Sequence, residues 1–152
     1  MSNLTTLKIK KLSASAEMPK LASQGASGFD ISASNEAAIT ILPGQRVKIP
    51  TGIAFELEPQ MEAQVRPRSG LAWKHGVTVL NAPGTIDADY RGEVNILLIN
   101  HGSEPFIVER GMRIAQIVVA SVSHVSILEC GEIGLTTRGD GGFGSTGLGA
   151  LS

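Results

Sequence analysis

Residues 77–99 read Val-Thr-Val-Leu-Asn-Ala-Pro-Gly-Thr-Ile-Asp-Ala-Asp-Tyr-Arg-Gly-Glu-Val-Asn-Ile-Leu-Leu-Ile. Two apolar runs, Val77–Leu80 and Val94–Ile99, form the ends of this stretch, and Pro83-Gly84 between them is a strong turn signal. The pattern is typical of a β-hairpin whose tip is formed by residues 81–93. It places the chain among proteins built from short β-strands.

The predicted hairpin tip carries two carboxylates and an aromatic ring. Asp87 and Asp89 alternate with apolar residues and with Tyr90. A strand period of two would send both acids to one face and the ring to the other, unless the turn twists them apart. Burying an unpaired carboxylate is costly, so acids at a tip suit proton transfer or hydroxyl binding better than a core position. A polar surface loop is the alternative for this segment taken alone.

The rest of the chain repeats the β pattern. Short alternating or near-continuous apolar stretches recur with turn residues between them, at residues 53–57, 61–65, 94–99, 114–119 and 122–128. We interpret each as a strand. Only Ser69–His75 has helical character, for a couple of turns at most. Together with the 18 glycines, these short strands predict an all-β sandwich or jelly roll.

Composition limits the class of protein. The 152 residues, 42% of them hydrophobic, are enough for one domain with a sizeable core. A net charge of −1 argues against a nucleic-acid-binding surface. Cys130 is the only cysteine, so no intrachain disulfide can form, which fits a reducing compartment. Because no apolar run approaches about 18 residues and the start lacks a secretory pattern, we expect a cytoplasmic protein without a membrane partner.

The C-terminal segment differs from the rest. Residues 138–152 read Arg-Gly-Asp-Gly-Gly-Phe-Gly-Ser-Thr-Gly-Leu-Gly-Ala-Leu-Ser. Such a segment buries too little apolar surface to offset its ordering entropy, so we divide the chain into a β-sandwich domain, 1–137, and a flexible arm. In the arm, Arg138 suits phosphate oxygens, Phe143 suits a stacked base, and Gly144–Thr146 can surround an anion. A frayed tail is the alternative.

Three further segments contain residues suited to a site. Arg66-Pro-Arg-Ser-Gly-Leu-Ala72 combines arginines with a helix start that Ser69 is placed to cap, which suits a phosphate. In Ala26-Ser-Gly-Phe-Asp30, the carboxylate can pair with an arginine or hold a metal-bound water. Arg110-Gly-Met-Arg-Ile-Ala-Gln116 ends on an amide inside an apolar run, where it needs a partner. Ordinary turns and a structural ion pair remain open for these three segments.

Taken together, these segments resemble the five ordered blocks of the trimeric deoxyuridine triphosphatase (dUTPase) family. In chain order the blocks are Ala26-Ser-Gly-Phe-Asp30, Pro67-Arg-Ser-Gly-Leu-Ala72, Asn81-Ala-Pro-Gly-Thr-Ile-Asp-Ala-Asp-Tyr-Arg-Gly92, Arg110-Gly-Met-Arg-Ile-Ala-Gln116 and Arg138-Gly-Asp-Gly-Gly-Phe-Gly-Ser-Thr-Gly147. One such block is weak evidence. Five in the family order, from residue 26 to residue 147, are highly specific.

The resemblance implies a fold, an assembly and a reaction. The fold is a distorted jelly roll of the β-clip kind with one short helical segment. The assembly is a homotrimer in which three subunits share each active site and an arm closes over a neighbouring subunit's site. The reaction is hydrolysis of dUTP to dUMP and pyrophosphate with Mg²⁺ on the substrate phosphates, which limits uracil incorporation into DNA and supplies dUMP for thymidylate synthesis.

The same resemblance implies a role for each site residue. Asp87 would be the general base that activates the attacking water, and Tyr90 would lie under the deoxyribose and exclude a 2′-hydroxyl. Asp30 would hold the magnesium ion through water only. The residues that would read the uracil are Asn81, Gly84, Thr85 and Ile86. Those that would bind the phosphates are Arg68, Ser69, Gly70 and Gln116. The arm would contribute Arg138, Phe143, Gly144, Ser145 and Thr146.

The chemistry of these residue types is consistent with the implied reaction. A positioned general base contributes about 10²–10⁴-fold to a rate. Magnesium keeps several of its waters, so a triphosphate can carry it without a dense cluster of protein acids. A backbone pressed against the base rejects an extra methyl group more sharply than an apolar pocket, whose discrimination is about 1–3 kcal/mol.

Two other functions remain open from the residues. One is a dCTP deaminase-like enzyme on the same fold, which would release ammonia. The other is a non-catalytic β-sandwich that senses nucleotides, which would not need a carboxylate beside the α-phosphate.

Overall fold

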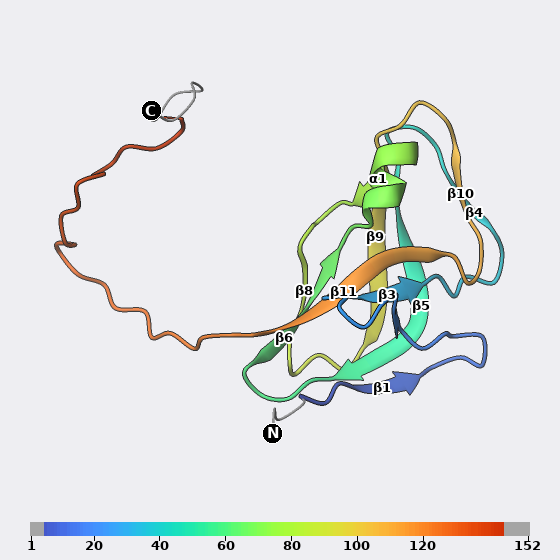
Figure 1. Cartoon of the computed structure of the whole chain (residues 1–152), viewed down its shortest axis with the longest axis horizontal. Coiled ribbons are helices and arrows are strands. Elements are labelled where there is room, and N and C mark those ends of the chain that lie inside the picture. The colour runs from blue at the N-terminus through green and yellow to red at the C-terminus, as the bar shows by residue number, and fades with distance from the viewer. Residues whose placement is uncertain (1–4, 145–152) are drawn as a thin grey trace.

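The computed structural model describes residues 5–144, and these form a β-sandwich with one short helix, α1 (Figure 1). One sheet has four strands in the order β1 (Lys8–Lys11), β5 (Arg46–Glu56), β9 (Glu93–Asn100) and β7 (Val77–Val79). The other has five, in the order β2 (Lys20–Leu21), β3 (Phe29–Ser32), β11 (Arg113–Ser121), β6 (Met61–Arg66) and β8 (Gly84–Ile86). A two-stranded ribbon pairs β10 (Phe106–Val108) with β4 (Ile39–Ile41). This confirms the all-β prediction.

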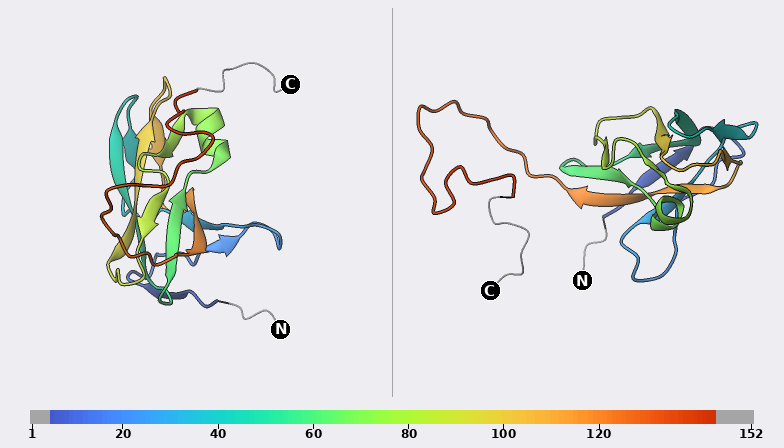
Figure 2. Two further views of the ribbon diagram at one scale, coloured as in Figure 1. Left: turned by 90° about the vertical axis from the view of Figure 1, so that its left-hand side faces the viewer. Right: turned by 90° about the horizontal axis from the view of Figure 1, so that it is seen from above.

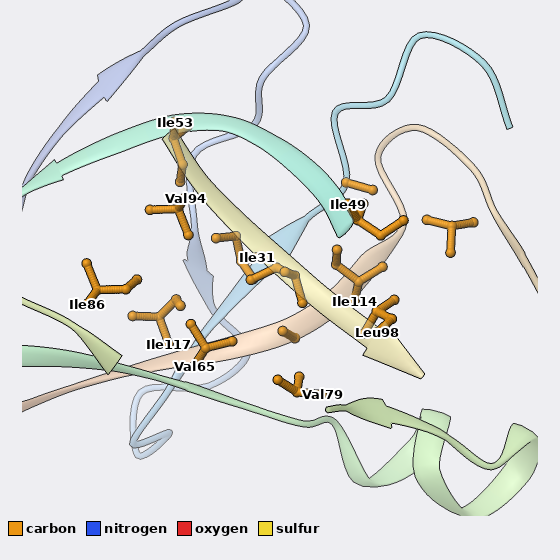
Figure 3. Close-up of a cluster of buried hydrophobic side chains, with 14 of the residues drawn as sticks. Ile31, Ile49, Ile53, Val65, Val79, Ile86, Val94, Leu98, Ile114 and Ile117 are labelled. Atoms are coloured by element: carbon orange, nitrogen blue, oxygen red, sulfur yellow. The ribbon is translucent and has the colours of Figure 1, made fainter. Parts of the chain in front are cut away.

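The core lies between the two main sheets and is aliphatic. Alternate residues of β9 are buried, as the period of two requires, so Ile96 and Leu98 point inward while Leu97 points out. Side chains from the five-stranded sheet, among them Ile31 and Ile117, meet them in one cluster (Figure 3). Within residues 5–144, no helix is long and apolar enough to cross a membrane.

The hairpin prediction around Pro83-Gly84 is half right. β7 and β9 do pair antiparallel, with Val79 opposite Leu98. The segment between them is not a simple tip, however, because it crosses to the other sheet, where β8 pairs with β6 and Thr85 lies opposite Gln64. Periodicity shows which face a residue takes but not which sheet its strand joins, so the crossing was not visible in the sequence.

The chain leaves the sandwich earlier than the apolar pattern predicts. β11 ends at Ser121, and the run 122–128 is not a strand, so that prediction was wrong. Residues 121–140 are exposed and extend away from the sheets, as the orange to red segment shows in Figure 1 and in the right-hand view of Figure 2. The side chains of Ile127 and Leu135 are 97% and 101% exposed. An apolar run predicts burial, but no surface formed by residues 5–144 buries this one.

The helix forms where it was expected but begins differently. α1 spans Ser69–His75 and ends at Gly76, whose φ of 67° is the left-handed conformation that glycine adopts most easily at a helix end. The prediction that Ser69 caps the helix was wrong, because Arg68 is the N-cap and makes no side-chain capping bond. Arg68 takes an extended backbone there, and its carbonyl accepts hydrogen bonds from the N–H groups of Leu71 and Ala72.

Asn100 ties three chain segments together at the end of β9. The side chain is fully buried, and its Nδ2 donates to the carbonyls of Ile41 and Glu104 at 2.9 and 2.8 Å. Its Oδ1 accepts from the N–H of Gly102 at 2.8 Å. The Asn100 side chain therefore satisfies backbone groups of the loop after β9 that have no strand partner.

Asn100→Ala should lower the free energy of unfolding by about 3 kcal/mol, because the buried carbonyl of Ile41 and the part-buried carbonyl of Glu104 and N–H of Gly102 all lose their partner. Urea denaturation at a fixed protein concentration measures this loss. Asn95→Ala is the matched control, since the half-buried Asn95 donates one bond, to the carbonyl of Glu93. Equal losses for the two variants would contradict the role given to Asn100.

Candidate active site

Strand register brings four polar residues into one row on the outer face of the five-stranded sheet. Lys20 lies opposite Asp30, Asp30 opposite Gln116, and Gln116 opposite Arg66. Their buried sequence neighbours, such as Ile31 and Ile117, point into the core. The row therefore joins residues from four strands that are far apart in the sequence, and its charge is positive.

Asp30 is clamped by two arginines at the centre of this face. The Nε of Arg68 donates to Oδ1 at 3.1 Å and its Nη2 to Oδ2 at 3.4 Å, while the Nη1 of Arg113 donates to Oδ2 at 2.9 Å. The Nη1 of Arg68 also donates to the carbonyl of Arg113 at 3.1 Å. The Asp30 side chain is only 15% exposed. Of the two alternatives that the sequence left for Asp30, the structure thus contains the ion pair.

Arg113 was missed by sequence reasoning for a geometric reason. It lies an odd number of residues from Gln116, so a regular strand would place the two on opposite faces. A bulge between Arg113 and Ala115 shifts the register, and Ile114 and Ala115 are both buried. The bulge brings Arg113 to the face of Asp30. Its place in the fourth block was the only signal in the sequence.

Gln116 is held by its neighbours. Its Nε2 donates to the carbonyl of Pro67 at 2.9 Å, which supplies the partner that the sequence analysis required. A Cβ added at Gly28 would lie 2.6 Å from the Oε1 of Gln116 and 3.3 Å from Val118. Gly28 therefore leaves the space in which the amide lies. One N–H of Gln116 remains for a ligand.

Ser69 and Gly70 follow Arg68 directly, and both are exposed at the start of α1. Space beside Gly70 is open, since a Cβ there would meet no atom within 4 Å. The structure thus brings Asp30, Arg68 and Gln116 into one cluster, with Ser69 and Gly70 at its edge.

Asp87 and Tyr90 lie at a different hollow, beyond β8. Asp87–Tyr90 is a turn, with the N–H of Tyr90 donating to the carbonyl of Asp87 at 3.1 Å. The twist that the sequence analysis allowed for is therefore present. A cavity of about 380 Å³ is lined by Lys48, Thr85, Ile86, Asp87, Tyr90, Glu93, Val94, Asn95 and Leu97. Asp87 also faces a second hollow of about 650 Å³ with Thr85 and Asp89.

Asn81 and Gly84 lie at the start of the same segment. Gly84 is buried against β6, where an added Cβ would lie 3.1 Å from the Cβ of Val65 and 3.3 Å from the Nδ2 of Asn81. Gly84 therefore lets β8 approach β6 closely. Asn81 is exposed beside it and does not line the 380 Å³ cavity.

The arm residues form a local turn outside the sandwich. The N–H of Gly141 donates to the carbonyl of Arg138 at 3.1 Å, and the Nε of Arg138 donates to the carbonyl of Gly141 at 2.8 Å. Phe143 is fully exposed with a φ of 50°, and Gly144 follows with a φ of 85°. Ser145 and Thr146 lie outside the described residues.

Comparison with known proteins identifies the family. The family model described as dUTPase matches residues 14–147. The chain belongs to the dUTPase family. Two relatives named deoxyuridine 5'-triphosphate nucleotidohydrolase are 54% identical over 134 residues (Rhizobium rhizogenes; 87% of this chain and 86% of the relative) and 53% identical over 146 residues (Rickettsia felis; 95% and 99%).

A solved dUTPase shares the fold of the chain. The enzyme from Staphylococcus bacteriophage 80alpha aligns with a TM-score of 0.86 over 94% of this chain and 99% of that one, at 24% identity. The jelly-roll expectation for this dUTPase-family chain is thereby confirmed.

In this dUTPase-family chain, Asp30→Asn should lower the free energy of unfolding by about 2 kcal/mol, because two guanidinium groups lose their shared carboxylate and repel each other. Urea denaturation at pH 7 and fixed protein concentration provides the measurement.

The control breaks an exposed ion pair instead. Lys8 Nζ lies 2.6 Å from the Glu56 carboxylate, and this hydrogen bond and charge, with a smaller contribution from Arg91, lower the pKa of Glu56. The Glu56 carboxylate is therefore ionised at pH 7. Glu56→Gln should change stability little, since exposed pairs contribute little. If Asp30→Asn is equally harmless, the clamp does not stabilise this face.

Proposed function

We propose that the chain hydrolyses dUTP to dUMP and pyrophosphate by attack of an Asp87-activated water on the α-phosphorus. The observation that carries the proposal is the exposed carboxylate of Asp87 at the rim of the hollow beside Tyr90, in a chain that matches the dUTPase family over residues 14–147. Relatives at 53–54% identity are named for this activity.

Asp87 is suited to the role of general base. It is exposed within the turn, so its carboxylate can reach a water, and in-line attack requires that water to lose a proton as the bond forms. Tyr90 lies at the same cavity and presents its ring as the surface on which the deoxyribose rests. Contact between that ring and the sugar would leave no room for a 2′-hydroxyl.

The uracil edge is read by backbone groups of β8 and by Asn81. β8 is the last strand of its sheet, so one row of its N–H and C=O groups has no strand partner within the described chain. Gly84, Thr85 and Ile86 supply that row. Backbone groups at a fixed position discriminate between uracil and thymine because the strand cannot move aside for a methyl group.

The cationic face binds the triphosphate. Three N–H groups of Arg68 are engaged by Asp30 and by the carbonyl of Arg113, which leaves two of its five for phosphate oxygens. Ser69 and Gly70 add a hydroxyl and open backbone, and Gln116 adds its remaining N–H. Arg113 and Arg66 contribute further positive charge on the same face.

The residues present fit a magnesium ion carried by the substrate. Among residues 5–144, no three His, Cys, Asp or Glu side chains gather as metal ligands. The two oxygens of Asp30 accept three hydrogen bonds, so the carboxylate keeps capacity for a water molecule but little for direct ligation. When bound, the ion would neutralise phosphate charge and fix the shape of the triphosphate.

Two observations support a homotrimer with shared sites. None of the phosphate-binding residues lines either hollow beside Asp87, so one chain separates the two halves of the site. The exposed segment before the arm, residues 122–137, also carries apolar side chains at Val125, Ile127, Leu128, Ile133 and Leu135, which water does not favour. A neighbouring copy offers both the missing half-site and a surface for this segment.

The compartment and the domain division are also part of the proposal. The single cysteine, Cys130, is free and exposed, which fits a reducing cytoplasm. The arm that acts at the site is residues 138–152, and residues 122–137 connect it to the sandwich.

The test of the function is pyrophosphate release by the purified chain with magnesium. We expect turnover of dUTP, little turnover of dTTP or UTP, and no ammonia from dCTP. In ¹⁸O-labelled water the label should appear in dUMP. Label found only in the pyrophosphate would refute attack at the α-phosphorus, and binding of dUTP without turnover would favour a nucleotide sensor.

Asp87→Asn should retain dUTP binding and lose about 10²–10⁴-fold in kcat, since the amide cannot accept the proton. The comparison is with Asp89→Asn in the same turn, which removes the same charge two residues away and should keep most of the activity. Equal effects of the two substitutions on kcat would assign the loss to charge rather than to a base.

Sharing of sites can be tested by complementation. A chain ending at Thr137 and full-length Asp87→Asn should each be nearly inactive alone. Subunits refolded together should show dUTP turnover well above the sum of the two parents, because one copy supplies the carboxylate and another the arm. Mixed trimers that form, by sedimentation, yet stay inactive would contradict a site shared in this way.

A further inference from the structure

Gly92 lies directly against the ring of Tyr90. A Cβ added at Gly92 would lie 2.6 Å from the Cζ and 2.9 Å from the Cε2 of Tyr90, and closer still to the hydroxyl. Carbon atoms that are not bonded do not approach so closely. The ring therefore occupies the space that any side chain at position 92 would take.

Hydrogen bonds hold the ring over this glycine. The hydroxyl of Tyr90 donates to the carbonyl of Glu93 at 2.9 Å. The side chain of Glu93 accepts from the N–H of Gly52 at 2.8 Å, which ties that residue to β5. The Nη1 of Arg91 donates to the carbonyls of Ala88 and Tyr90 at 2.6 and 3.0 Å and closes the turn. The ring is thus fixed at its hydroxyl and at its backbone.

Gly92 is not required here for its backbone freedom. Its φ lies outside the left-handed region, unlike that of Gly76 or Gly111, so alanine fits the backbone without strain. The three atoms that a Cβ would meet first all belong to the ring, and the ring is partly exposed. Alanine at this position should therefore displace the ring at the cost of its one hydroxyl hydrogen bond, to the carbonyl of Glu93.

We propose that Gly92 is a positioning residue for sugar selectivity, because it seats the Tyr90 ring against the backbone at the height that excludes a 2′-hydroxyl. The inference rests on the proposed function, in which the deoxyribose lies on this ring. A methyl group at position 92 would tilt or lift the ring. The sugar would then lose its close contact, and the space closed to a ribose would open.

The kinetic test compares Gly92→Ala with Gly25→Ala. Gly25 is the matched control, since its φ is ordinary and a Cβ there meets no atom within 4 Å. Gly92→Ala should lower kcat/KM for dUTP and raise the UTP/dUTP ratio of kcat/KM by about tenfold or more, as expected when a contact surface shifts by an ångström. Gly25→Ala should leave both unchanged.

A double-mutant cycle distinguishes action through the ring from a general defect. If Gly92 acts through Tyr90, adding Gly92→Ala to Tyr90→Ala should change the UTP/dUTP ratio no further. Should Gly92→Ala alone fail to fold, its folding in the Tyr90→Ala background would still demonstrate the contact. A failure to fold in both backgrounds would overturn the inference.

A direct readout needs no substrate. Tyr90 is the only tyrosine of the chain, so incorporation of 3-fluorotyrosine gives one ¹⁹F resonance. Gly92→Ala should shift that resonance and Gly25→Ala should not. An unshifted resonance, or a wild-type UTP/dUTP ratio in Gly92→Ala while Tyr90→Ala relaxes selectivity, would overturn the inference and leave the proposed function standing. Loss of dUTP hydrolysis in the wild-type chain would be a separate failure.

Discussion

The clamp of Asp30 between Arg68 and Arg113 is the interaction on which the cationic face depends, and this face is the proposed phosphate-binding surface. A site for a triphosphate must hold several cations close together before the anion arrives, and like charges at such distances repel. One partly buried carboxylate offsets that repulsion and gives both guanidinium groups a fixed geometry. It also joins β3, β11 and the turn before α1, which lie far apart in the sequence.

The proposed function also accounts for a site shared between copies. The cations of the row point outward from the five-stranded sheet. The hollow at Tyr90 lies at the edge of the sandwich, where Thr85 and Ile86 of β8 border it together with Lys48, Asn95 and Leu97 of the four-stranded sheet. None of the proposed phosphate-binding residues lines this hollow or the second one at Asp87, so under the proposal another copy brings its cations to Asp87.

The sequence predicts what local physics decides. Alternation predicts the strands, and the sparse helical signal at Ser69–His75 predicts the one short helix of the described chain. Three features depend on long-range partners and could not be predicted from the sequence. They are the crossing of β8 to the second sheet, the bulge that exposes Arg113, and the exposure of the apolar run 122–128. The resemblance to the family named the site residues; the structure shows which of them already meet.

Rigidity and exposure are divided between the parts of the site according to their tasks. Under the proposed function, discrimination by one hydroxyl requires a surface at a fixed position, and the turn at Tyr90 is closed by bonds through Arg91 and Glu93 with the ring seated on Gly92. Under the same proposal, closing over a ligand requires an exposed segment, and Phe143 is fully exposed beside the local turn that residues 138–141 form. Glycine occurs in both the turn at Tyr90 and the arm, for different reasons. At Gly92 the missing side chain makes room for the ring, whereas at Gly144 the backbone bends with a φ of 85°, which glycine adopts easily. The sequence letter is the same, so only the surrounding atoms distinguish the two uses.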